Sequence, residues 1–149
     1  IKIKFFPDKA PKTCTNFKRL VNFGFYNGIA FHRIIPGFII QAGDLLSRDN
    51  DRNNDGMGEI GYTIESEVSD LRHERGTVAM ARKPFDMDSA SSQFYICLAK
   101  NSNLDGAYTI FGEVIQGMDV VDKIGVAKRD GNDNPIERIE IQKAWIGTE

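Results

Sequence analysis

The order of apolar and polar residues predicts short strands and two helices. Apolar residues alternate with lysines over residues 1–5, as in a strand with one face in water. After Pro11 the apolar residues recur at helical spacing, and Gly24 is suited to end that helix. The apolar face of this first helix is formed by Cys14, Phe17, Leu20 and Val21.

Further along the chain the pattern is dominated by short extended runs. Strands are predicted over 31–35, 37–43, 77–81, 93–98, 109–114 and 136–146, and a second amphipathic helix over 117–124. Strands and helices do not alternate as they would in a parallel α/β protein. The sequence therefore predicts a mainly β protein, a closed antiparallel sheet whose ends are covered by two helices.

Residues 31–44 form an apolar run that contains one cation, Arg33, and one amide, Gln41. Pro36-Gly37 favours a turn in its middle, so the run is interpreted as two strands joined at a kink. Alternation places Gln41 with Ile39 on one face of the second strand. Because an isolated buried charge is costly, Arg33 must either meet a carboxylate or lie at the mouth of a cavity.

Three blocks of sequence carry a resemblance to a known family. They are Phe31–Phe38 followed by Gln41 and Gly43-Asp44, then Met80–Arg82 with Ser89–Ile96, then Leu104–Gly112. In this order they resemble the cyclophilin-type peptidyl-prolyl cis-trans isomerases. The resemblance implies an eight-stranded β-barrel capped by two α-helices, formed as one domain by residues 1–149. It also implies that the first strand begins upstream of Ile1.

The resemblance also implies a role for individual residues. Arg33 would donate a hydrogen bond to the prolyl nitrogen of an X-Pro substrate and so act as the catalytic residue. Phe38, Ile39, Tyr95 and Leu104 would line the proline pocket, and Tyr108 would close one side of it. Gln41 and Gln93 would bind the substrate backbone, together with backbone groups near Ala81 and Arg82. No cofactor and no metal is required.

The chain departs from the family pattern at several positions. Tyr95 stands where phenylalanine is usual, and its hydroxyl needs a hydrogen-bond partner. Asn103 stands where many members have tryptophan, which implies reduced affinity for cyclosporin A. The loop Arg48–Gly61 is longer and more acidic than usual; if it borders the groove, we expect it to favour peptides with Lys or Arg beside the proline.

Two motifs are rejected on their context. Gly56–Gly61 matches the G-x-G-x-x-G dinucleotide pattern, but an Asn/Asp loop precedes it and extended structure is predicted after it. Asp51, Asn53 and Asp55 imitate the start of an EF-hand, but Tyr62 stands at its twelfth position and neither flank is helical. We expect a solvated acidic loop there.

Composition limits the remaining classes. The 149 residues carry a net charge of −2 with no run of Lys or Arg, which argues against nucleic-acid binding, and there is no apolar stretch of membrane-spanning length. Two cysteines are too few for a disulfide framework; we expect both to be buried thiols in a reducing, cytoplasmic setting. Of the two histidines, His32 is predicted to be packed and His73 to be exposed in a charged turn.

Two functions follow from these observations. The first is an active prolyl isomerase, a monomer acting on X-Pro peptides and proteins. The second is a non-catalytic proline-peptide binding or scaffolding domain of a larger protein. Arg33 favours the enzyme, because a binding domain has no need of that donor.

Overall fold

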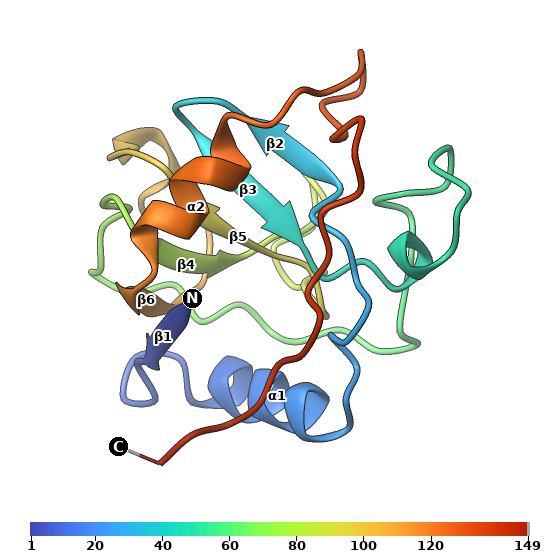
Figure 1. The fold of residues 1–149 in the computed structure, drawn as a ribbon. Coiled ribbons are helices and arrows are strands. Elements are labelled where there is room, and N and C mark those ends of the chain that lie inside the picture. The colour runs from blue at the N-terminus through green and yellow to red at the C-terminus, as the bar shows by residue number, and fades with distance from the viewer. Residues whose placement is uncertain (149) are drawn as a thin grey trace.

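The computed structural model describes residues 1–148 and shows an antiparallel sheet with two α-helices packed against it (Figure 1). The sheet has six strands in the order β1-β6-β4-β5-β3-β2, and all its neighbours pair antiparallel. The strands are β1 (Lys2–Phe5), β2 (Arg33–Ile35), β3 (Ile39–Ala42), β4 (Thr77–Met80), β5 (Phe94–Cys97) and β6 (Ile110–Gln116). The helices are α1 (Pro11–Asn22) and α2 (Met118–Gly125), with short 3₁₀ turns η1 (Leu45–Arg48) and η2 (Ser102–Leu104).

The two faces of the sheet carry separate apolar clusters. Ile40 and Ala42 of β3 belong to the main core, which also includes the buried faces of α1 and α2. Ile39, which directly precedes Ile40 along β3, belongs to a second, smaller cluster on the opposite face. This division follows from the period of two along each strand. It confirms the predicted separation of Ile39 and Gln41 from Ile40 and Ala42.

Helix α1 begins and ends as the sequence predicts. Pro11 occupies the first turn, where its missing N–H costs no hydrogen bond, and Gly24 follows the helix with a positive φ of 72°. Phe17 is the central residue of its buried face. Its ring lies 4.7 Å from Tyr26, 5.0 Å from Phe111 and 5.2 Å from Phe94, measured between centroids.

The apolar run of residues 31–44 forms a hairpin of β2 and β3. Arg33 lies opposite Gln41 in the register, and Ile35 lies opposite Ile39. The connection contains Gly37 with φ of 71°, a conformation that favours glycine, so the kink predicted at Pro36-Gly37 is confirmed.

The C-terminal segment differs from its prediction. Residues 136–146 are extended but form no strand of the sheet, so the strand predicted there is wrong. The segment runs beside residues 28–31 and is joined to them by the isolated bridge Ala30–Glu140 (Figure 1). In addition, the Ile141 N–H donates to the Ile29 carbonyl and the Gly28 N–H donates to the Ile141 carbonyl. A second isolated bridge, Ile64–Ala90, marks another extended segment outside the sheet. The sheet therefore has six strands, whereas the resemblance implies eight. The two extended segments make only single bridges, and a single bridge is too short to count as a strand of the sheet.

Two further expectations concern the cysteines and membranes. Cys14 and Cys97 are both buried and both free thiols, as expected. Within residues 1–148, none of the helices combines the length and the hydropathy that crossing a bilayer requires.

We expect Phe17→Ala to lower the free energy of unfolding by about 3–5 kcal/mol, because it removes a ring packed against four other rings, those of Phe5, Tyr26, Phe94 and Phe111, and leaves a cavity. Urea unfolding followed by circular dichroism measures this. Phe23→Ala is the matched control, since Phe23 follows the same helix but is 76% exposed; its effect should stay within about 0.5 kcal/mol. Equal losses in the two variants would contradict the central place of Phe17 in the core.

Candidate functional site

A row of hydrogen bonds crosses the sheet on the face that carries the smaller apolar cluster. All the bonds of this row are donated in the same direction. The Arg33 guanidinium donates from Nη1 to Oε1 of Gln41 at 3.2 Å. Gln41 donates from Nε2 to Oε1 of Gln93 at 2.9 Å, and Gln93 donates from Nε2 to the carbonyl oxygen of Gly56 at 3.0 Å. Each amide uses its oxygen toward Arg33 and its nitrogen away from it, so the row holds the Arg33 side chain in one orientation.

Strand register places the members of this row. Gln41 lies opposite Arg33 on one side and opposite Tyr95 of β5 on the other. Gln93 immediately precedes β5, at the edge of the same face. Arg33, Gln41 and Gln93 therefore converge although they come from positions up to 60 residues apart in a chain of 149.

The last acceptor of the row is held by a buried carboxylate. Asp44 is fully buried and accepts hydrogen bonds from the backbone N–H groups of Gly56 at 2.6 Å and Gly58 at 2.8 Å. These donors offset the loss of water around the carboxylate. They also fix the backbone at Gly56, whose φ of 88° is a conformation that favours glycine.

An apolar cluster lies on the same face of the sheet as the row. Its members include Phe38, Ile39, Ala81, Tyr95, Leu104 and Tyr108, and Tyr95 lies opposite Gln41 in the register. These are the residues that would form the predicted proline pocket. Ile39 and Tyr95 are almost completely buried, whereas Phe38, Leu104 and Tyr108 remain partly accessible. An apolar surface beside a cation offers contacts to a small ring and a hydrogen-bond donor to the group attached to it.

Arg82 closes the rim of this pocket. Its guanidinium carbon lies 4.5 Å from the centre of the Tyr108 ring, and its Nε and Nη2 donate to the Ala107 carbonyl at 3.0 and 2.9 Å. The Tyr108 ring in turn meets the Tyr95 ring edge to face at 5.8 Å. Cation–π contact and the bonds to Ala107 hold this side of the pocket together.

His73 is not exposed, so the prediction for this residue is wrong. Its side chain is fully buried, with Nε2 lying 2.9 Å from the Tyr95 hydroxyl and Nδ1 lying 3.0 Å from Oδ1 of Asp105. The hydrogen bonds from the backbone N–H and the ring of His73 lower the pKa of the Asp105 carboxyl. The prediction failed because the charged neighbours of His73 face the solvent while the ring turns inward. The unusual hydroxyl of Tyr95, which needed a partner, was the signal that could have identified it.

His32 is packed, as predicted. It is 5% exposed, and burial lowers its pKa, while the charges of Asp44 and Asp55 act in the opposite direction. It lines a polar hollow of about 370 Å³ together with Arg33, Gln41 and Gln93. The far wall of this hollow is formed by the loop residues Arg52, Asn53, Asp55, Gly56 and Met57 and by Asn132 and Asn134.

The acidic loop therefore borders the groove, but much of its charge is already engaged. Glu59 pairs with Lys83 at 2.5 Å, and Arg52 pairs with Asp130 at 2.9 Å. Asp55 lines the hollow and accepts a bond from the Asn134 side chain at 2.6 Å. The preference for peptides with Lys or Arg stays a prediction, with Asp55 as the carboxylate placed to cause it.

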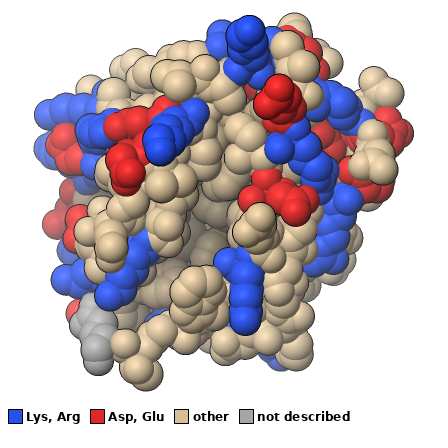
Figure 2. Space-filling view, viewed as in Figure 1, with Lys and Arg blue, Asp and Glu red and all other residues tan. Residues whose placement is uncertain are grey.

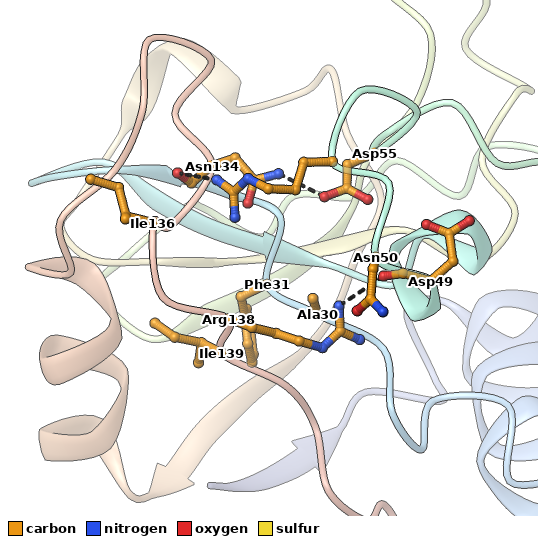
Figure 3. Close-up of a pocket in the computed structure, with 10 residues that line it drawn as sticks. Ala30, Phe31, Asp49, Asn50, Asp55, Asn134, Ile136, Arg138 and Ile139 are labelled. Atoms are coloured by element: carbon orange, nitrogen blue, oxygen red, sulfur yellow. Dashed lines mark hydrogen bonds between the residues drawn. The ribbon is translucent and has the colours of Figure 1, made fainter.

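A second crevice lies behind the same loop. It measures about 220 Å³ and separates Asp49, Asn50 and Asp55 from residues 134–139 (Figure 3). Bonds from Asn134 to Asp55 and from Arg138 to the Asp49 carbonyl cross it. None of the residues predicted for the site lines this crevice. The two bonds across it attach the loop to the C-terminal segment.

Charged residues of both signs are intermingled on the face seen in Figure 2. That face shows no broad patch of Lys and Arg. It gives no support to a nucleic-acid-binding surface, in line with the composition.

Of the ten predicted site residues, Arg33, Gln41 and Gln93 line the polar hollow, six belong to the apolar cluster, and Arg82 lies over the Tyr108 ring. The roles assigned to them stay predictions. Asn103 lies on η2 beside Leu104 and is exposed. Three residues were missed: His73, Asp105 and Gly56. Gly56 is the first residue of the rejected dinucleotide motif; no helix follows it, and its carbonyl, not its N–H, serves the site.

Comparison with known proteins gives consistent matches over nearly the whole chain. The family model described as cyclophilin type peptidyl-prolyl cis-trans isomerase/CLD matches residues 1–146. The peptidyl-prolyl cis-trans isomerase ppi1 of Schizosaccharomyces pombe is 38% identical over 144 residues, which are 97% of this chain and 90% of that protein. A probable peptidyl-prolyl cis-trans isomerase of Brucella abortus is 46% identical over 123 residues, 79% of this chain and 62% of that protein.

A solved structure is similar as well. The crystal structure of a cyclophilin type peptidyl-prolyl cis-trans isomerase from Cryptosporidium parvum, in the presence of the dipeptide Ala-Pro, superposes with a TM-score of 0.89 at 30% sequence identity. The match covers 99% of this chain and 92% of that chain. It confirms the predicted fold class, an antiparallel sheet with two helices.

Cys97 is a buried member of the smaller apolar cluster, and burial raises the pKa of its thiol to about 12. Burial also raises the pKa of Cys14. We expect both thiols to resist a disulfide reagent in the native protein at about pH 8, because the thiolate is the reactive form. Both should react fully in guanidinium chloride. Met57→Cys is the control, since Met57 is 72% exposed and its replacement should react at once. Rapid native reaction of Cys97 would show that the pocket floor is open.

Proposed function

The chain belongs to the cyclophilin type peptidyl-prolyl cis-trans isomerase family, and on that premise we propose how its groove acts on a proline. The protein is an isomerase that accelerates rotation about X-Pro peptide bonds. The supporting observation is the Arg33 guanidinium, oriented by Gln41 and Gln93 at the edge of an apolar pocket.

The reaction is a rotation, so no covalent bond is made or broken. Its barrier is roughly 18–20 kcal/mol because the C–N bond has partial double-bond character. As the bond twists, the prolyl nitrogen regains its lone pair and becomes a better hydrogen-bond acceptor. A fixed donor aimed at that nitrogen binds the twisted state more tightly than either planar isomer, which is the condition for catalysis.

Arg33 suits this role because it is planar, always charged and has several donors. One of its N–H groups is used by Gln41, and the exposed side chain leaves others free to face a substrate. Because the amide row fixes its direction, little reorganisation is needed when the bond twists. A thousandfold acceleration requires only about 4 kcal/mol of differential stabilisation, which a charged donor can supply.

The apolar pocket holds the proline ring while the acyl side turns. Phe38, Ile39 and Leu104 offer apolar contacts, and Tyr95 and Tyr108 add ring faces. Gln41 and Gln93 lie between this pocket and the polar hollow, where they can bind the substrate backbone. The relative solved with Ala-Pro supports proline peptides as the substrate class.

We further propose a reducing, cytoplasmic setting, supported by the two free thiols. We also propose that cyclosporin A binds weakly. The exposed amide of Asn103 offers neither the area nor the N–H of an indole.

Arg33→Ala should lower kcat/KM for a short X-Pro peptide by about 10²–10³-fold, the usual cost of losing one donor to a transition state. Arg33→Lys, which keeps the charge but not the planar fork, should recover only part of the rate. The free energy of unfolding should change little, because the side chain is exposed. Exchange spectroscopy by NMR measures the rate. Undiminished turnover in Arg33→Ala would refute the mechanism, and peptide binding without turnover in the wild type would identify a binding domain instead.

Asn103→Trp should tighten cyclosporin A binding by about tenfold or more, as expected for an added aromatic anchor. Isothermal titration calorimetry on the wild type, Asn103→Trp and the control Asn103→Ala measures the three affinities. The alanine variant should bind like the wild type. No gain in the tryptophan variant would remove Asn103 as the cause of weak binding.

A further inference from the structure

His73 lies outside the row of Arg33 and outside the pocket walls, yet its polar groups are all engaged. Its backbone N–H donates to Oδ1 of Asp105 at 2.7 Å, and its carbonyl accepts from the N–H of Asn101 at 2.8 Å. Its ring contacts Asp105 through Nδ1 and the Tyr95 hydroxyl through Nε2. His73 is therefore held by two backbone and two ring hydrogen bonds, and its side chain is completely buried.

The chemistry of the partners sets the direction of the two ring bonds. A carboxylate only accepts, so Nδ1–H donates to Asp105. In the tautomer that carries its only ring proton on Nδ1, Nε2 is an acceptor and takes the hydrogen bond of the Tyr95 hydroxyl. Burial raises the pKa of Tyr95 far above its ordinary value, so this hydroxyl keeps its proton and remains the donor.

The contacts of His73 lead to both sides of the pocket. Tyr95 is the wall that stands on β5. Asp105 directly follows Leu104, the wall carried by η2, and Asn101 directly precedes η2. His73 thus holds both ends of η2 and, through the Tyr95 hydroxyl, ties that turn to the sheet. The His73 ring also lies nearly parallel to that of Tyr95, with centroids 6.0 Å apart and planes 14° apart.

We propose that His73 is a positioning residue of the isomerase, which sets the width of the proline pocket by fixing Leu104 relative to Tyr95. The inference rests on the proposed function, because it takes this pocket as the proline site. His73 does not touch Arg33 and makes no bond in the amide row. It therefore acts on the binding of proline peptides, and hence on KM, and leaves the step that Arg33 promotes unchanged.

Two amide substitutions separate the two ring bonds. In His73→Asn the side-chain nitrogen can take the place of Nδ1 and keep Asp105, while the bond to Tyr95 is lost. In His73→Gln the longer side chain can reach Tyr95, while the ring bond to Asp105 is lost. We expect His73→Gln to raise KM for a short Ala-Pro peptide by about tenfold, as for one lost bond to a charged group, and to leave kcat within about twofold.

Tyr95→Phe provides the matched partner variant, since it removes only the hydroxyl. Alone it should raise KM by about threefold, as should His73→Asn, because each removes the same hydrogen bond between neutral groups. In the His73→Asn background, Tyr95→Phe should change KM no further. This non-additivity shows that the hydroxyl acts through His73.

The outcomes are distinct. A wild type without turnover, or an Arg33→Ala variant with full turnover, would overturn the proposed function itself. If the wild type is active and Arg33→Ala is inactive, three results would overturn only the inference. The first is an unchanged KM in His73→Gln, His73→Asn and Tyr95→Phe, and the second is a fall in kcat at constant KM. The third is additive effects of Tyr95→Phe and His73→Asn. If His73→Gln does not fold, the Tyr95→Phe and His73→Asn pair decides. A ¹⁵N spectrum of the wild-type imidazole should show the proton on Nδ1, and a proton on Nε2 would contradict the scheme.

Discussion

The buried carboxylate of Asp44 is the contact on which the geometry of the groove depends. It accepts from Gly56 and Gly58 and so fixes the carbonyl that ends the row from Arg33. Without a fixed acceptor at Gly56, the Gln93 amide could turn over, and Gln41 could follow it. The direction of the Arg33 donor therefore rests on a charge that takes no part in the reaction, because an oriented row transmits the position of its last acceptor.

The two-sided sheet separates stability from catalysis. Ile40 and Ala42 pack into the core with the helices, whereas Ile39 and Gln41 of the same strand lie on the opposite face, the side proposed for the substrate. A single strand thus supplies a core wall, a pocket wall and a member of the amide row. Because the apolar cluster and the proposed donor stand on one sheet face, a proline bound as proposed would meet Arg33 at a constant distance, as a rotation catalyst requires.

Local pattern predicted the parts of this site that depend on local geometry. The placement of Gln41 and Ile39 on one face follows from the period of a strand. That Arg33, Gln93 and Leu104 belong to one site could be predicted only from the family motifs. The local pattern around His73 did not predict its burial, because its partners lie 22 and 32 residues away and its near neighbours are charged. The strand predicted over residues 136–146 was wrong for a related reason. A pattern typical of an extended segment does not show whether a neighbouring strand is present to pair with it.

The attachment of the C-terminal segment has a consequence for biosynthesis. The N–H of Ile34, next to Arg33, donates to the Asp133 carbonyl at 2.7 Å, and Phe31 donates to Ile139. During translation Arg33 is made early, but these acceptors leave the ribosome roughly a hundred residues later, after several seconds at about 5–20 residues per second. The strand that carries Arg33 cannot complete its hydrogen bonds before then. We therefore expect a nascent chain of this enzyme to gain its own activity only when residues up to 139 have emerged.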